Sequence, residues 1–187
     1  MATAGPNTSG TQTVTERGGL TPTWATLSNV NASDNTRAQT GGMSTTAAQT
    51  PSDYADLTNF GFSVPSGATI NGVTVAIERS AASGNVQDDT VQLIKGGTAS
   101  GTNKADTATN WPAAGSEASV NYGGVADLWS LTLTDTDVNA SNFGVRIAAK
   151  TASTGTNIAQ IDLVTITITY TAAAVSTRLL GLLGVGT

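Results

Sequence analysis

Residues 57–80, LTNFGFSVPSGATINGVTVAIERS, decide the fold that the sequence predicts. From Val73 to Ile77, apolar and polar residues alternate, which is typical of a half-buried β-strand. The stretch begins inside another predicted strand, 54–62, which carries two phenylalanines. Between the two strands, Pro65 fixes φ and Gly67 accepts positive φ, as a turn requires. We therefore expect two strands joined by a tight corner.

Most of the remaining chain repeats this pattern of short strands and small-residue turns. The strongest strand is predicted at 158–171, and its apolar residues change parity near Leu163, which predicts a β-bulge there. A Gly84-Asn85 pair favours a hairpin between two neighbouring strands. Thr134 is placed to cap a single helical turn. Further strands are predicted at 36–40, 86–95, 117–122, 128–133 and 143–147.

About eight or nine strands at short spacing, with no helix of any length, predict an all-β fold. We expect an antiparallel, jelly-roll-like β-sandwich formed by residues 21–171. Trp24 is expected to cover one end of its core. Residues 1–20 are rich in Thr, Gly and Ser, and we expect a flexible N-terminal arm. Residues 172–187 are expected to form a spacer and an apolar C-terminal tail.

The composition narrows the functions to consider. The 187 residues have a formal net charge of -5, and the eight Lys and Arg residues are scattered, whereas nucleic-acid binding needs them clustered. The chain has no Cys and no His, the usual thiol nucleophile, general base and transition-metal ligands. No secretory signal is visible, and no apolar run approaches the roughly 20 residues of a membrane-spanning helix. We expect a protein made in a cytoplasm, without enzymatic activity, cofactor, metal, nucleic-acid or membrane partner.

Pairs of carboxylates close together in the sequence are the residues that could form a metal-binding or catalytic site in this chain. Calcium ions take several oxygen ligands, and glycosidases need two facing carboxylates. None of the pairs has the spacing of a defined calcium loop, so we interpret them as solvated turn residues. The pairs are Asp53 with Asp56, Asp88 with Asp89, and Asp135 with Asp137.

Three aromatic residues, Trp111, Tyr122 and Trp129, are the candidates for stacking against a ligand. Trp111 lies in the longest irregular segment, 96–116, and long loops in compact domains are often functional. A tryptophan there either pins the loop to the sheet or offers a flat face to a sugar or a partner protein. We favour pinning and keep stacking as the alternative.

The last residues of the sequence are its most apolar part. Left in water, each large apolar side chain would cost roughly 1.5 to 3 kcal/mol relative to burial, so something should cover them. They either fold back on their own domain or dock into another subunit. The residues that we predict for assembly are Leu179, Leu180, Leu182, Leu183 and Val185.

Several stretches resemble a domain that recurs in structural proteins of tailed bacteriophages and prophages. The likeness spans about Trp24 to Tyr170 and follows strands and corners rather than a catalytic motif. The stretches that carry it are Thr58–Val73, Ile77–Arg79, Asp89–Leu93, Lys95–Gly97, Gly101–Ala105, Tyr122–Gly124, Asp127–Trp129 and Asn139–Val145.

This resemblance implies a virion protein on the particle surface, such as a capsid decoration protein, a head fibre or a tail-associated component. The absence of a coiled-coil or repeat stalk favours a small decoration subunit. Such a protein would contact the major capsid protein. Decoration proteins commonly sit on local three-fold axes of the capsid, so the resemblance implies a homotrimer. The alternative is a carbohydrate-binding or host-surface-binding module, free or on a phage tail, because jelly rolls also host such sites.

Overall fold

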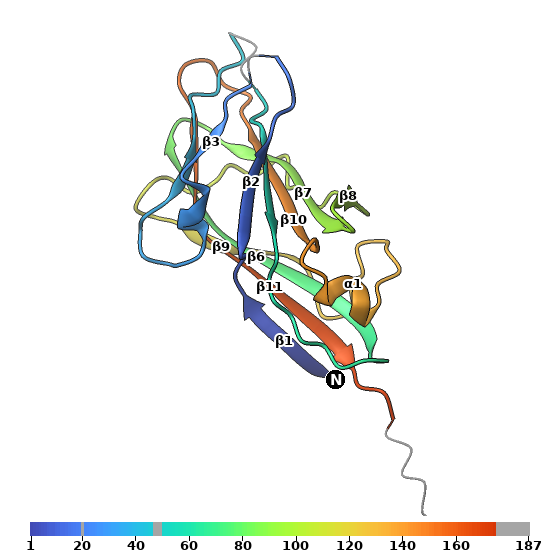
Figure 1. The fold of residues 1–187 in the computed structure, drawn as a ribbon. Coiled ribbons are helices and arrows are strands. Elements are labelled where there is room, and N and C mark those ends of the chain that lie inside the picture. Colours follow the sequence, from blue (N-terminus) through green and yellow to red (C-terminus); the bar gives the residue numbers. More distant parts are fainter. Residues whose placement is uncertain (20, 47–49, 175–187) are drawn as a thin grey trace, which may run out of the picture.

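The computed structural model describes residues 1–19, 21–46 and 50–174. The five apolar residues predicted for assembly, Leu179, Leu180, Leu182, Leu183 and Val185, lie outside the described residues. The described chain forms two antiparallel sheets packed face to face, so the prediction of an all-β antiparallel sandwich is confirmed (Figure 1). It contains eleven strands rather than eight or nine.

One sheet has six strands and the other has five. The six-stranded sheet contains β1 (Ala2–Asn7), β3 (Trp24–Ala25), β4 (Ala38–Thr40), β6 (Thr69–Ser83), β9 (Ala118–Gly123) and β11 (Ile158–Thr171). The five-stranded sheet contains β2 (Thr11–Thr15), β5 (Tyr54–Thr58), β7 (Gln87–Lys95), β8 (Thr98–Ser100) and β10 (Gly144–Lys150). The described residues also form two short helices, the 3-10 helix η1 (Leu27–Val30) and the α-helix α1 (Asp135–Asn139).

The chain changes sheet at almost every connection. Only β3–β4 and β7–β8 are joined within one sheet, and every other pair of consecutive strands lies in different sheets. This alternation wraps the chain around a single core, as in jelly rolls. Each sheet is thus assembled from strands distant in sequence, such as β11 between β4 and β6.

The stretch 57–80 crosses from one sheet to the other. Its first strand, β5, ends at Thr58, and Asn59 and Gly61 adopt positive φ values of 59° and 65°. The expected strand through residue 62 is therefore wrong, and residues 59–68 form a long connection instead of a tight corner. Phe60 and Phe62 are nonetheless buried and stacked, with ring centroids 6.0 Å apart.

The Gly84-Asn85 pair also makes a crossing and not a hairpin, because β6 and β7 belong to different sheets. Asn157 holds this corner: its Oδ1 accepts a hydrogen bond from the Asn85 backbone N–H at 2.8 Å. A Cβ at Gly84, where φ is 73°, would lie 1.9 Å from the same Oδ1. Glycine is required here both for the backbone conformation and for the space that Asn157 occupies.

Two local predictions are confirmed. Strand β11 runs over 158–171 as expected, and its pairing with β6 shifts between Ile161 and Leu163, where the bulge was predicted. Thr134 caps α1: its hydroxyl accepts from the Asp137 backbone N–H, and the Asp137 carboxylate accepts from the Thr134 backbone N–H. This reciprocal capping box stabilises a helix of only one turn.

The strand predicted at 128–133 is absent. Trp129 and Ser130 adopt positive φ values of 57° and 59°, which no strand accommodates. The Trp129 side chain is fully buried, and its indole N–H donates to the Val73 carbonyl at 2.9 Å. Burial of the indole therefore overrides the alternating pattern.

The first residues are an integral part of the sandwich, so the prediction of a flexible arm over 1–20 is wrong. Strand β1 pairs with β11 in one sheet, and β2 pairs with β5 in the other. The two strands are nearly devoid of large apolar residues because they lie at sheet edges, with one side open to water.

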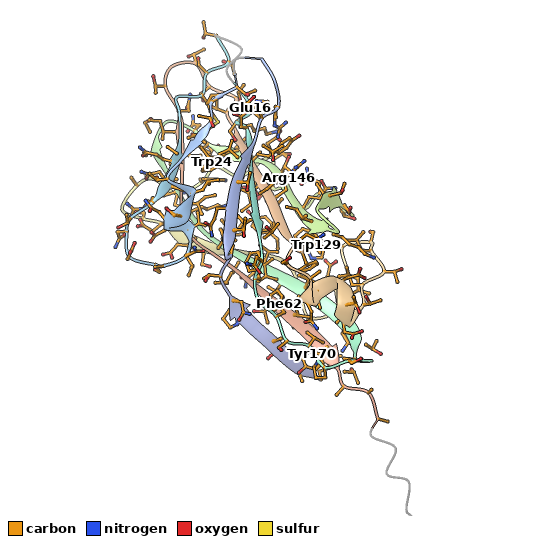
Figure 2. All side chains as sticks on the ribbon, in the orientation of Figure 1. Glu16, Trp24, Phe62, Trp129, Arg146 and Tyr170 are labelled. Atoms are coloured by element: carbon orange, nitrogen blue, oxygen red, sulfur yellow. The ribbon has the colours of Figure 1, made fainter. Side chains whose placement is uncertain are left out.

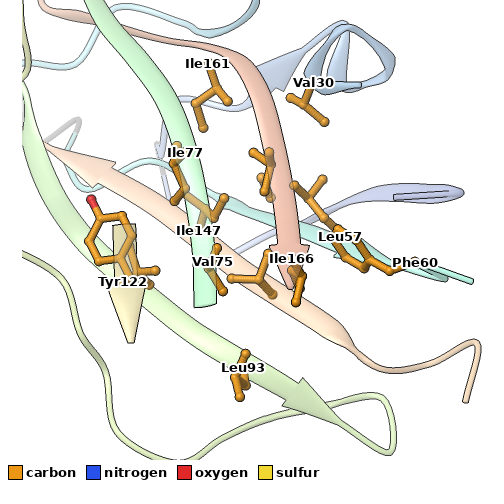
Figure 3. Packing of buried hydrophobic residues seen from close by; sticks show 14 of the residues in the cluster. Val30, Leu57, Phe60, Val75, Ile77, Leu93, Tyr122, Ile147, Ile161 and Ile166 are labelled. Carbon is orange, nitrogen blue, oxygen red and sulfur yellow. The ribbon is translucent and has the colours of Figure 1, made fainter. Parts of the chain in front are cut away.

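The core lies between the sheets and is built from their inward-facing residues (Figure 3). Ile77 and Ile166 come from the six-stranded sheet and Leu57 and Ile147 from the five-stranded sheet, and each is at most 1% exposed. Trp24 is buried as expected, with its indole N–H bonded to the Asp53 carbonyl. Within the described ranges, no helix has the length and apolar character needed to cross a bilayer.

Amide hydrogen exchange tests the integration of the first strands. We expect the paired amides of β1 and β2 to exchange far more slowly than their intrinsic rate, at rates like those of the edge strand β8, because all three are held by sheet hydrogen bonds. Exchange at the intrinsic rate throughout residues 2–15 would restore the flexible-arm interpretation.

Candidate functional site

A buried ion pair lies between the two sheets. Arg79 of β6 and Asp88 of β7 are 3% and 1% exposed, and the Arg79 guanidinium donates to Asp88 Oδ1. Asp88 also accepts from the Trp111 indole N–H and the Tyr122 hydroxyl, both at 2.7 Å, and from the Asp106 backbone N–H at 2.9 Å. These donors offset the cost of removing the carboxylate from water.

The three predicted stacking residues belong to the interior. Trp111, Tyr122 and Trp129 are 4%, 5% and 0% exposed. Burial raises the pKa of Tyr122, and the Arg79 guanidinium lies 5.0 Å from the Trp111 ring centroid and 5.6 Å from that of Tyr122. None of the three offers an open ring face to a sugar, so the stacking alternative for these residues is corrected, and Trp111 pins its loop.

A β-bulge separates Asp88 from Asp89. Ala148 of β10 pairs with Thr90, and Ala149 pairs with Asp88, so Asp89 is the extra residue on β7. Asp88 consequently points into the core, while Asp89 and Thr90 both bind the Arg17 guanidinium on the outer face of the five-stranded sheet. The two acids, adjacent in sequence, cannot form one site.

A second polar cluster, which we call the outer-face cluster, consists of Arg17, Tyr54, Asp56, Asp89 and Arg146. Arg146 binds Asp56 through two hydrogen bonds of 2.7 and 2.6 Å, and this raises the pKa of Arg146. The Tyr54 ring packs against both arginines, with guanidinium carbons 4.0 and 4.3 Å from its centroid. The cluster is electrically balanced and half-buried. Figure 2 labels Arg146, one of its members.

Ion pairs engage most of the basic side chains. Six lie within 4.0 Å of a carboxylate, and each has its own acidic partner. The positive charge on the described surface is therefore largely neutralised locally. The six are Arg17, Arg37, Arg79, Lys95, Lys104 and Arg146.

Of the other predicted carboxylate pairs, Asp135 and Asp137 both lie in the first turn of α1, whereas Asp53 and Asp56 are divided between separate environments. Asp137 closes the capping box and binds Lys95; burial raises its pKa, but hydrogen bonds from Thr134 and Lys95 outweigh burial and lower it. Asp56 lies in the outer-face cluster, whereas Asp53 lines a polar pocket at one pole of the sandwich. In the described ranges, no three acidic residues converge on one point.

Sequence reasoning missed the arginines and found only part of each cluster. Arg79 continues the parity of Val73, Val75 and Ile77, so the sequence places a charge at a core position of β6. That outlier was a usable signal, because a buried arginine requires an acidic partner. The outer-face cluster left no such signal, since it joins residues from four separate segments.

Comparisons with known proteins give one distant structural likeness. No family model matches this chain, and no curated protein matches it. Among solved structures, it is similar to the second N-terminal cellulose-binding domain of Cellulomonas fimi β-1,4-glucanase C, with 16% sequence identity and a TM-score of 0.44. The match covers 89% of this chain and 94% of that domain. A likeness at this level supports no argument about function.

Substitutions at two neighbouring carboxylates, Asp88 and Asp89, test how much the buried ion pair contributes to stability. We expect Asp88→Asn to lower the free energy of unfolding by about 3 to 5 kcal/mol, because it leaves the Arg79 charge buried without its counter-ion. Asp89→Asn, a matched change one residue away, should cost less than about 1 kcal/mol, since its pair with Arg17 is partly exposed.

Urea denaturation at pH 7 measures both variants. Equal losses of stability in the two would contradict the central position of the Arg79–Asp88 pair.

Proposed function

We propose that this protein is a non-enzymatic structural protein of a tailed-phage virion, and specifically a capsid decoration protein. The observation that carries the proposal is the place where the chain leaves the sandwich. Strands β1 and β11 run antiparallel with Ala2 opposite Tyr170, so the N-terminus and the end of β11 lie at the same pole (Figure 1). We call this the terminal pole.

The apolar segment 179–185 follows β11 after a short run of small and polar residues. Five large apolar side chains within seven residues favour attachment to another protein surface, because each is costly to leave in water. Their connection to the terminal pole suits a role in which one end of the sandwich grips a larger assembly. The rest of the body then extends outward.

The described surface is consistent with a protein whose role is structural rather than catalytic. Most of its basic side chains are paired with carboxylates, and its tryptophans are buried. The stretches that resemble phage virion domains include the crossing connection at 58–68 and parts of β6, β7 and β10, which build the scaffold. A likeness carried by scaffold residues supports a shared architecture more than a shared ligand.

Decoration of a capsid implies contact with the major capsid protein, and a homotrimer is the assembly that we propose. The apolar residues Leu179, Leu180, Leu182, Leu183 and Val185 would make the contact between subunits or with the shell. The protein would act on the capsid exterior after synthesis in the host cytoplasm.

Solution mass tests the assembly role of the apolar segment. We expect the full chain to form a discrete trimer, and a chain that ends at Ala174 to be a folded monomer, because removal of residues 175–187 deletes the apolar contacts. Light scattering gives the two masses, and circular dichroism shows whether the shortened chain keeps its β-structure.

A full-length variant distinguishes the effect of losing the apolar side chains from the effect of shortening the chain. Replacing Leu179, Leu180, Leu182 and Leu183 together by serine should reproduce the effect of truncation. A trimer that survives both changes, or a monomer in every case, would contradict assembly through this segment.

Glycan binding is the second candidate, and the outer-face cluster is the observation that favours it. Arginine, carboxylate and tyrosine groups lie together there, with Gln92 opposite Arg146 on the neighbouring strand. Such groups supply the hydrogen bonds that saccharides require. However, existing partners already engage the arginines and the Tyr54 ring, so less binding capacity remains free.

A glycan array distinguishes the two candidates. For a decoration protein we expect no saturable binding by the full chain. Saturable binding that Gln92→Ala and Arg146→Ala each weaken at least about tenfold, equivalent to about 1.4 kcal/mol, would instead favour the glycan-binding function.

A further inference from the structure

We propose that the free edge of strand β9 receives the apolar segment 179–185 of a neighbouring subunit, which adds to the six-stranded sheet as a further strand. This inference rests on the proposed assembly function and names the surface that the segment contacts. An exposed sheet edge can bind an extended peptide in this way, because its backbone N–H and C=O groups supply the hydrogen bonds. Strand β9 ends its sheet, with β6 on one side and no strand of the described chain on the other.

The backbone groups of Ser119 and Asn121 point away from β6. At the end of the β6–β9 ladder, the Gly124 N–H donates to the Val73 carbonyl at 3.1 Å. Because bonded and non-bonded residues alternate along an antiparallel ladder, every second residue of β9 bonds to β6, and Ser119 and Asn121 lie between these residues. Both are exposed, and among the described residues none forms a hydrogen bond with their N–H or C=O groups. These groups are therefore available to an added strand.

Strand β9 lacks the features that protect an edge strand from pairing with another chain. Its six residues include no proline and no charged side chain. By contrast, β1 contains Pro6 and a register shift, β3 and β8 have two and three residues, and β2 is followed directly by Glu16 and Arg17. Proline, charge, short length and irregular pairing are the usual means of preventing edge-to-edge association. Among the described strands, β9 therefore has the edge best suited to receive a partner.

Strand β9 also lies close to the terminal pole, from which the chain leaves the sandwich. Gly123, at the end of β9, is aligned with Thr167 of β11, because Thr74 of β6 pairs with both. Thr167 lies four residues before Thr171, the last residue of β11, a distance of roughly 13 Å along a strand. The seven residues 172–178 can span roughly 24 Å when extended, which is enough to reach β9 of a subunit packed beside this pole.

The segment and the edge match in length and in charge. Residues 179–185 number seven and carry no charge, and β9 has six uncharged residues. On the inward side of β9, Tyr122 is buried, whereas Val120 is only partly buried and packs against the core. An added strand would place alternate apolar side chains beside Val120 and extend the core at this edge. The same arrangement would remove those side chains from water, which is the cost that the segment otherwise carries.

Proline substitutions in the full chain test the pairing, with solution mass as the readout. Asn121→Pro removes an N–H that points to the free edge and leaves the hydrogen bonds to β6 in place, and proline is tolerated on edge strands. We expect this variant to be a monomer by light scattering, with its β-structure retained by circular dichroism. The matched control is Thr13→Pro, at the centre of edge strand β2, whose N–H also points to an open edge. This control should remain a trimer.

Disulfide trapping tests the same contact without a proline, because the chain has no cysteine of its own. Leu182→Cys combined with Ser119→Cys or with Asn121→Cys should give disulfide-linked oligomers up to the trimer on a non-reducing gel. Leu182→Cys combined with Thr13→Cys should not. Cross-links confined to monomers would show that the segment pairs with β9 of its own chain, and would overturn the proposal. The absence of cross-links from both β9 positions would overturn it as well.

The outcomes distinguish this inference from the proposed assembly function. If the chain that ends at Ala174 remains a trimer, the apolar segment is not the assembly element, and the proposed function and the inference both fail. If truncation gives a monomer but Asn121→Pro remains a trimer, the segment docks on another surface, and only the inference is overturned. Loss of the trimer in both Asn121→Pro and Thr13→Pro would also overturn the inference, because the effect would not be specific to β9.

Discussion

The ion pair between Arg79 and Asp88 is the constraint on which the arrangement of this sandwich depends. Each charge comes from a different sheet, and both are almost completely removed from water. Burying two ions costs several kcal/mol per ion unless further hydrogen bonds compensate, and Asp88 obtains these from Trp111, Tyr122 and the Asp106 backbone. The pair thereby fixes β6, β7, β9 and the long loop before β9 relative to one another. Asp88, Trp111 and Tyr122, which the sequence offered as candidates for a binding site, stabilise the packing of the two sheets instead.

The alternation of the chain between sheets explains why the first residues are part of the fold. Because consecutive strands lie in different sheets, each sheet is completed by strands from distant parts of the sequence. Strand β1 lies against β11, and β2 against β5, so one end of the sandwich lies at the start of β1 and the other lies beyond the end of β2. One end carries the N-terminus and the end of β11, and the other carries the pocket that Glu16 and Asp53 line.

This polarity suits a protein that attaches at one end and displays the other. The proposed assembly segment follows β11 in the sequence, whereas a polar pocket that Asp53 lines lies at the far pole. Between them, the outer face of the five-stranded sheet carries charges that are balanced by Arg146 with Asp56 and Arg17 with Asp89. Internal pairing of this kind leaves little unbalanced charge on that face for other partners.

The sequence by itself determined the local features of this protein. Period-two alternation predicted β11 and the change of parity predicted its bulge, and Thr134 predicted the cap of α1, because these depend on residues close together in the chain. Tertiary structure alone decided that Gly84-Asn85 forms a crossing, that Trp129 is buried in a turn, and that β1 and β2 are strands. It also decided the candidate sites, since the meeting of Asp88 with Arg79, or of Asp56 with Arg146, depends on how the strands are brought together. Sheet partners are selected by burial and long-range pairing, and neither is encoded within a single short stretch.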